Sequence, residues 1–220
     1  MNIFVIGAAG RVGRETVKSL VNKGHTVSAA DIRIDAITES DNVKAVKFDL
    51  HDSASYLSKA IKGHDAVIFA AGSTVEEEML RIDAFGVVKS SEAAKLAGVT
   101  RFILLSAKWA MYPELWNQID IKDSVEKSHD FYIAKYFANY HIIRDTELQF
   151  TIIEPDILTD TTATGKIELN NMKAIGTSVK DAAEVLATCV DSDKTIGKIY
   201  TINNGETPIK EALNNLSGMH

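Results

Sequence analysis

The chain begins Met1-Asn-Ile-Phe-Val-Ile-Gly7-Ala-Ala-Gly10-Arg-Val-Gly13, a short apolar run that leads into three glycines spaced three residues apart. A helical pattern follows directly and extends to Lys23. A strand, a glycine turn and a helix in this order can bind the pyrophosphate of a dinucleotide, because the helix N-terminus offers free N–H groups and a partial positive charge. Gly7 permits the tight turn, Gly10 lets the backbone approach phosphate, and Gly13 lets the helix pack close to the strand.

We therefore expect the turn to bind a cofactor through Gly7, Ala8, Ala9, Gly10, Arg11, Val12 and Gly13. The alternative is a glycine turn in some other α/β protein. An acidic residue roughly 20 positions after the turn favours the first interpretation, since it can accept hydrogen bonds from an adenosine ribose. Asp31 stands there, after the strand-like run Thr26–Ala30.

The sequence leaves the choice between NAD and NADP open. Asp31 favours NAD, whereas Arg33, two residues later, could pair with the 2′-phosphate of NADP. A solvent-exposed surface arginine is the alternative interpretation of Arg33.

Size and composition predict one soluble domain over residues 1–220. The net charge is −6 and the sequence contains no basic cluster, which argues against nucleic-acid binding. No signal segment and no apolar run of about 18 residues is present, so we expect a cytoplasmic protein that does not contact membranes. The single cysteine, Cys189, lies in a helical pattern and is expected to be buried and inert.

Strand-like and helix-like segments alternate through the first two-thirds of the chain. The strand candidates are apolar throughout, as strands buried on both faces of a parallel sheet are. They are Asn2–Ile6, Thr26–Ala30, Val43–Phe48, Asp65–Ala70, Arg101–Ser106 and Phe150–Ile153; the helix candidates are Arg11–Lys23, Ser53–Ile61, Glu76–Ala97 and Asp130–Thr146. This alternation predicts an α/β fold, a three-layer Rossmann-like doubly wound parallel sheet.

The last third of the chain is less regular, and we expect a reduced C-terminal region. Residues 159–171 are polar and could form a short pair of strands or a loop over the site. Val179–Val190 predicts a helix and Lys198–Ile202 a strand. Thr207 and Pro208 are expected to open a last helix, as its N-cap and first helical residue.

Ligands of this fold bind beyond the carboxyl ends of the strands, so each strand end is a candidate site. Asp49, after the third strand, could meet an adenine amino group or could cap the following helix. Ala70, Ala71 and Gly72, after the fourth, are small enough for the backbone to run under a ribose, although turn formation explains them equally well.

With these residues in place, the chain resembles the atypical short-chain dehydrogenase/reductases, a family of NAD(P)-binding, sugar-epimerase-like proteins with small bacterial members. The resemblance covers essentially the whole chain. It rests on residues 7–13, Asp49-Leu50, residues 70–72, Ile82-Asp-Ala-Phe-Gly86, residues 92–102, Ser106, Ala134-Lys135, residues 151–155 and residues 205–213. It implies a cofactor across the strand ends, with Leu50, Lys135 and Pro155 among the residues that contact it.

In active relatives a Ser, a Tyr and a Lys carry the chemistry. The Tyr hydroxyl exchanges the proton that accompanies hydride transfer, and the Lys, four residues later, lowers the Tyr pKa and holds the nicotinamide ribose. The resemblance assigns the Lys to Lys135 and the Ser to Ser106, one or two residues before the usual position. The Tyr position holds Phe131, which has no proton to give.

Two tyrosines remain as weaker candidates for the proton donor. Tyr132 precedes Lys135 by three residues, which turns its side chain about 100° from the expected direction. Tyr112 lies in the aromatic segment Trp109–Trp116, between the fifth strand and the helix of Lys135. This segment could line an apolar substrate pocket, or could simply pack as a long loop or a subunit contact.

The sequence therefore predicts an NAD(P)-dependent oxidoreductase that transfers hydride to or from a small organic molecule, with quinone-like or flavin-like substrates needing least help from an acid. A non-catalytic NAD(P)-binding redox sensor with a protein partner is the main alternative, and epimerase- or dehydratase-type chemistry is the third. We expect a monomer or homodimer. The six histidines show no metal-ligand spacing, so no metal is expected. The sequence does not identify the substrate.

Overall fold

The computed structural model describes residues 1–118, 129–173 and 175–215. A nine-stranded sheet runs through them in the order β11-β8-β10-β6-β5-β4-β1-β2-β3. The pairs from β3 to β10 are parallel, and β8 pairs antiparallel with both β10 and β11. The strands are β1 (Asn2–Ile6), β2 (Thr26–Asp31), β3 (Val43–Lys47), β4 (Ala66–Phe69), β5 (Arg101–Leu105), β6 (Gln149–Pro155), β8 (Lys166–Leu169), β10 (Lys198–Asn204) and β11 (Thr207–Pro208).

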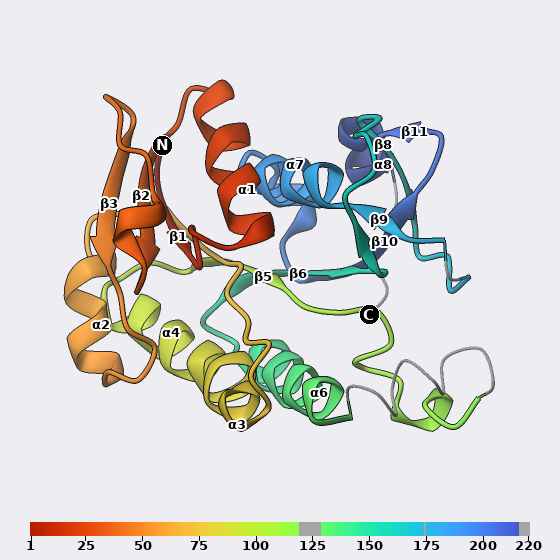
Figure 1. The fold of residues 1–220 in the computed structure, drawn as a ribbon, viewed down its shortest axis with the longest axis horizontal. Coiled ribbons are helices and arrows are strands. Elements are labelled where there is room, and N and C mark those ends of the chain that lie inside the picture. Colours follow the sequence, from red (N-terminus) through yellow and green to blue (C-terminus); the bar gives the residue numbers. More distant parts are fainter. Residues whose placement is uncertain (119–128, 174, 216–220) are drawn as a thin grey trace.

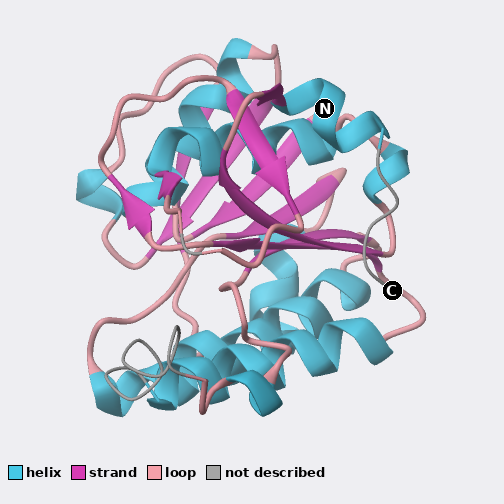
Figure 2. Ribbon diagram, turned by 90° about the vertical axis from the view of Figure 1, so that its right-hand side faces the viewer, coloured by secondary structure: helices cyan, strands magenta, loops and turns pink. Residues whose placement is uncertain are grey.

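Helices cover both faces of the sheet (Figures 1 and 2). On one face lie α1 (Arg11–Asn22) and α7 (Val179–Val190), with α8 (Ile209–Asn215) beside α7. The other face is covered by α2 (Ala54–Ile61), α4 (Phe85–Leu96) and α6 (His129–Arg144), with the short α3 (Glu76–Met79) next to them. This confirms the predicted three-layer, doubly wound α/β fold.

The strand β1 shows why an uninterrupted apolar run forms the centre of the sheet. Successive side chains of a strand point to opposite faces. Ile3 and Val5 pack into the core under α1 and α7, whereas Phe4 and Ile6 pack into the core under α2, α4 and α6. Because both faces are covered by helices, both sets of side chains must be apolar.

The segment predicted as one helix, Glu76–Ala97, contains a break. The structure divides it into α3, a π-helical turn Leu80–Ala84, and α4. A π-helical turn inserts an extra residue and redirects the side chains it carries, which is a frequent arrangement at functional sites. Here it turns Asp83 inward, where the side chain is fully buried.

The C-terminal region adds small elements around the end of the sheet. The polar stretch 159–171 carries a strand, β8, and β7 (Leu158–Thr159) pairs parallel with β9 (Thr177–Ser178). The predicted helix start at Thr207 and Pro208 is wrong. Thr207 pairs with Ile167 to form β11, and α8 begins only at Ile209. Three single 3₁₀ turns, Ile34–Ala36, Pro113–Leu115 and Asp193–Thr195, complete the described elements.

Within the described ranges, none of the helices combines the length and the apolar character that crossing a bilayer requires.

Candidate active site

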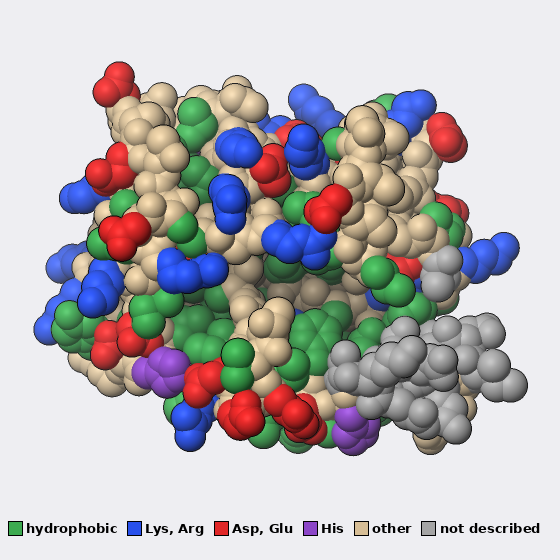
Figure 3. Space-filling model, in the orientation of Figure 1, with side chains coloured by type: hydrophobic (Ala, Val, Ile, Leu, Met, Phe, Trp, Pro, Cys, Tyr) green, Lys and Arg blue, Asp and Glu red, His purple; other side chains and the backbone are tan. Residues whose placement is uncertain are grey.

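A groove with a volume of about 810 Å³ runs along the carboxyl ends of the central strands. Figure 3 shows it as a hollow across the middle of the molecule. Most of the residues predicted to bind cofactor line it: Gly7, Ala9, Gly10, Arg11, Val12, Asp31, Arg33, Asp49, Leu50, Ala70, Ala71, Gly72 and Lys135. Three others, Ala8, Gly13 and Pro155, are buried and do not line the groove.

The glycine turn forms the floor of the groove where β1 leads into α1. Gly7 has φ +82, and a Cβ atom on it would lie 2.5 Å from the Cα of Ala71. A Cβ on Gly13 would lie 2.1 Å from the carbonyl oxygen of Gly7. Both positions therefore require glycine for conformation or close packing.

The first turn of α1 fits a phosphate group. The N–H groups of Arg11 and Val12 have no acceptor within the helix, because the first N–H groups of any α-helix lack one. Gly10, the N-cap, has no side chain to occupy the space in front of them. The Arg11 side chain reaches the later segment of the chain, where its Nη2 lies 2.8 Å from Asp160 Oδ1.

Asp31 is buried beside the glycine turn and accepts hydrogen bonds from protein groups at both oxygens. Its Oδ2 accepts from the backbone N–H of Ala9 at 3.0 Å, and its Oδ1 accepts from the backbone N–H of Arg33 at 3.0 Å. The Arg33 Nε also lies 3.5 Å from Oδ1. Asp31 therefore ties the turn after β1 to the loop after β2.

At the next strand end, Asp49 faces the groove together with His51. The alternative role of Asp49 as a helix cap is wrong, because Ser53 caps α2 and accepts a hydrogen bond from Tyr56 N at 3.3 Å. His51 Nδ1 lies 2.8 Å from Asp49 Oδ1, and its Nε2 lies 2.8 Å from Glu78 Oε2. The hydrogen bonds to Asp49 and Glu78 raise the pKa of His51.

Lys135, on α6, reaches the groove as a buried cation. Its Nζ lies 3.0 Å from Asp83 Oδ1 and 3.5 Å from the carbonyl oxygen of Leu105. The other oxygen of Asp83 accepts from the backbone N–H of Ser73 at 2.8 Å. A buried charge is costly unless it is paired, so Asp83 is the group that allows Lys135 to be charged here.

Asp83 is the site residue that sequence reasoning missed. The motif Ile82-Asp-Ala-Phe-Gly86 contains it, but the single-helix interpretation of 76–97 gave no reason to place this carboxylate in the groove. Its signal was that it is the one acidic residue between Met79 and Ser91.

Ser106 and Phe131 complete the wall next to Lys135. The Ser106 side chain is only 5% exposed, and its Oγ has no hydrogen-bond partner within the described part of the chain. A buried unpartnered hydroxyl that lines a groove fits a site for a polar ligand atom. The Phe131 ring lines the groove as well, with its centroid 5.3 Å from Lys135 Nζ.

The two tyrosine candidates lie outside the groove. Tyr132 is buried against Ala107 and Trp109, and this burial raises its pKa to about 12. Tyr112 does not line the groove either, and burial raises its pKa too. Of the two, neither is placed to exchange a proton with a ligand in the groove.

The aromatic segment 109–116 forms a packed cluster instead of an open wall. Trp109 adopts a positive φ of 66 and is buried. Its carbonyl oxygen accepts from Trp116 Nε1 at 2.9 Å, and both tryptophans pack near Tyr132. Ordinary packing, one of the alternatives left open by the sequence, describes this arrangement.

Three other titratable groups, His25, His64 and Cys189, lie outside the groove. His25 lies 3.1 Å from Asp191, and His64 bonds the Ile61 carbonyl oxygen and the Ser28 hydroxyl. Cys189 is buried, and burial raises the pKa of its thiol to about 12.

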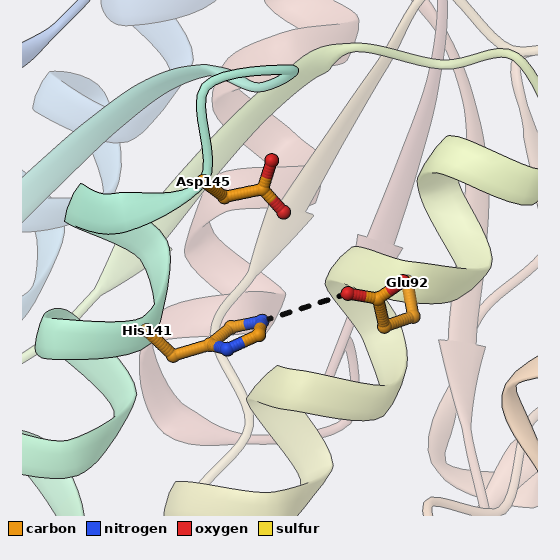
Figure 4. Close-up of side chains that lie close together, drawn as sticks. All are labelled: Glu92, His141 and Asp145. Carbon is orange, nitrogen blue, oxygen red and sulfur yellow. Dashed lines mark ion pairs between the residues drawn. The ribbon is translucent and has the colours of Figure 1, made fainter.

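A cluster far from the groove has the composition of a metal site. Possible ligand atoms of Glu92, His141 and Asp145 lie within 4.8 Å of one another (Figure 4). However, Lys95 Nζ lies 2.6 Å from Asp145 Oδ2 and 3.0 Å from Glu92 Oε1. The ammonium group already occupies the place of a cation between these carboxylates, so the cluster links α4 to the end of α6.

Comparison with known proteins identifies the family of this chain. A sequence model of the NAD(P)H-binding family matches residues 7–193. An uncharacterized sugar epimerase of Bacillus subtilis is 33% identical over 98% of this chain and 100% of its own length.

Solved structures show the same fold. An oxidoreductase of Lactococcus lactis has a TM-score of 0.92 and 37% identity, covering 100% of this chain and 99% of its own. A protein of Bacillus halodurans, described as a candidate NAD-dependent epimerase/dehydratase, has a TM-score of 0.86 and 29% identity over 98% of this chain and 100% of its own. A more distant short-chain dehydrogenase/reductase of Veillonella parvula, crystallised with NADP, shares the fold with a TM-score of 0.75 at 12% identity, over 94% of this chain and 96% of its own.

Proposed function

The chain belongs to the NAD(P)H-binding family, and we propose that it is an NAD(P)-dependent oxidoreductase that transfers hydride to a small planar acceptor of the quinone or flavin class. The observation that carries the proposal is Phe131. It lines the groove together with Lys135 and Ser106, at the position where the resemblance to short-chain dehydrogenase/reductases leads us to expect a tyrosine.

Each group of residues in the groove has a separate role in this reaction. When bound, the nicotinamide cofactor supplies the hydride. The glycine turn binds its pyrophosphate, and Lys135, oriented by Asp83, holds a ribose hydroxyl. The unpartnered Ser106 hydroxyl donates a hydrogen bond to an oxygen of the acceptor.

The identity of the acceptor follows from the missing acid. Hydride transfer to an isolated carbonyl leaves an alkoxide, which needs a proton from a nearby group. Hydride transfer to a quinone or a flavin leaves an anion that is delocalised over the ring system, so the one proton that completes the reduction can come from water. The balance is one reduced cofactor, one acceptor and one proton, giving one oxidised cofactor and one reduced acceptor.

The experiment is to follow oxidation of NADH and NADPH by a quinone, a flavin and an aldehyde. We expect activity with the first two and none with the aldehyde. Lys135→Ala should reduce the activity, whereas Lys44→Ala, which removes an exposed lysine of β3, should not. Phe131→Tyr should add activity toward the aldehyde, because it restores a proton donor beside Lys135.

The second candidate is a non-catalytic protein that senses the redox state of NAD(P) and reports it to a protein partner. The loss of the tyrosine with retention of the cofactor groove favours it as well. Tight cofactor binding with no oxidation by any acceptor would support the sensor and exclude the oxidoreductase.

A further inference from the structure

A second pocket opens between α1 and the edge of the sheet, and we propose that it binds a small apolar carboxylate, such as an aromatic or a short-chain acid. It has a volume of about 260 Å³. Residues 36–38, from the loop between β2 and β3, contribute to its lining. Of the described residues, Arg14 alone lines both this pocket and the groove of the candidate active site. The pocket is therefore a separate site.

The order of the strands explains why a pocket forms here. The helix α1 packs over β1 and β2, and β3 lies beyond them at the edge of the sheet (Figure 1). The floor of the pocket includes Ala29 of β2 and Val43 of β3, which are both buried on the sheet face that α1 covers. The small side chain of Ala29 leaves room above this floor.

The walls of the pocket are apolar and only partly covered. Val17 and Val21 are four residues apart on α1 and share one face of the helix. Together with Ile37 they line the pocket, and all three are half-buried and pack against the core. A ligand with an apolar part would remove this surface from water, which favours binding in proportion to the area. Drug-sized ligands occupy pockets of about 300–1,000 Å³, so this smaller pocket suits a single ring or a short chain.

The charge at the pocket favours a carboxylate on that ligand. The exposed Arg14 uses its Nη2 to donate to the carbonyl oxygen of Ala9 at 3.0 Å, and no ion pair among the described residues includes it. The other basic residue of the pocket, Lys18, already pairs with Glu15 at 2.7 Å. A guanidinium with donors to spare binds a carboxylate through paired, charge-assisted hydrogen bonds. Arg14 therefore binds the acid group of the ligand, and Val17 and Val21 contact its apolar part.

The test follows the amide signals of the isotope-labelled whole chain by NMR as benzoate is added, with benzamide as the uncharged ligand of the same shape. We expect benzoate to shift the signals of Val17, Val21 and Ile37 with a Kd of about 1 mM or lower, as ligands of about nine non-hydrogen atoms can reach. Benzamide should bind at least about tenfold more weakly, because it lacks the charge that pairs with Arg14. No shift at these residues, or equal affinity for the two ligands, would overturn the inference.

Two substitutions remove different parts of the site. Arg14→Gln removes the positive charge and should weaken benzoate binding at least about tenfold while leaving benzamide binding unchanged. Val21→Phe places a ring in the pocket and should abolish binding of benzoate. Val88→Phe, the same substitution at a half-buried position of α4, is the control and should bind benzoate as the wild type does. Unchanged benzoate binding in Arg14→Gln, or in a Val21→Phe protein that unfolds in urea as Val88→Phe does, would overturn the inference.

A titration in the presence of NADPH separates this inference from the proposed function. Saturating NADPH should not displace benzoate, because the pocket and the groove share Arg14 alone. Complete displacement would show that benzoate binds in the groove, and the inference would fail. If NADPH did not bind at all, the proposed function would fail and the carboxylate site would stand.

Discussion

The carboxylate of Asp83 and the ammonium group of Lys135 lie 3.0 Å apart with both side chains buried. They come from different elements, a π-helical turn and α6. The pair fixes the Lys135 ammonium group at the groove, which Ser106 and Phe131 also line. The proposed chemistry needs this ammonium group to hold a hydroxyl of the cofactor ribose.

Removing Asp83 should therefore destabilise the protein. In Asp83→Ala the ammonium of Lys135 is left buried without its partner, and we expect the free energy of unfolding in urea to fall by about 3–5 kcal/mol. The double variant Asp83→Ala/Lys135→Met, which removes both charges, should recover a large part of the loss. An Asp83→Ala protein as stable as the wild type would show that the pair contributes nothing.

Gly24 is a matched control for a test of Gly7 in the glycine turn. Both have a positive φ, +82 and +84, but a Cβ on Gly7 meets Ala71 at 2.5 Å, whereas a Cβ on Gly24 meets nothing within 4 Å. Gly24→Ala should cost only the conformational strain, about 1–2 kcal/mol. Gly7→Ala should cost clearly more and should also abolish cofactor binding, as measured by urea unfolding and calorimetry. Equal effects of the two substitutions on stability would contradict the close approach.

The protonated imidazole of His51 should stabilise the folded state by linking the loop after β3 to α3. Hydrogen bonds to Asp49 and then Glu78 raise its pKa, so the added stability is complete below the ordinary histidine pKa and is lost as pH rises through the raised value. Glu78→Gln should lower the pKa of His51 in an NMR titration. Glu77→Gln, on the same short helix, is the control. An unchanged titration in Glu78→Gln would show that the contact is absent in solution.

Glu154, on β6, should make the protein less stable as pH rises, whereas a carboxyl group with a lowered pKa makes a protein more stable. Burial raises its pKa to about 8, and its Oε1 accepts from Asn139 Nδ2 at 2.8 Å. The folded state therefore binds a proton that the unfolded state has lost, and stability falls as pH rises from about 4.5 to about 8, by about 1 kcal/mol per pH unit. In Glu154→Gln, the free energy of unfolding in urea should no longer fall over this pH range. The same fall as in wild type would contradict the raised pKa of Glu154.

The sequence predicted the fold well because the decisive signals are local. The glycine turn and the apolar strands each follow from neighbouring residues. The two errors, the uninterrupted helix over 76–97 and the helix start at Thr207, arose where a distant partner decides the local structure. Thr207 pairs with Ile167, and the π-helical turn carries Asp83 toward Lys135.

The sequence predicted which strand ends form the candidate site, but not which of its residues contact one another. Gly7, Asp31 and Asp49 were identified by position alone. That Asp31 would bond Ala9 and Arg33, or that Tyr132 would pack against Trp109, depends on how loops from separate strands meet. One sequence carries no direct record of such contacts.

Oxidation of NADPH by a quinone, followed beside the same reaction with an aldehyde, tests the central claim most directly. Wild type should oxidise NADPH with the quinone and leave the aldehyde unchanged, and Phe131→Tyr should gain the aldehyde reaction. A wild-type protein that reduces the aldehyde as fast as the quinone, or that binds NADPH and oxidises it with neither, would contradict the account.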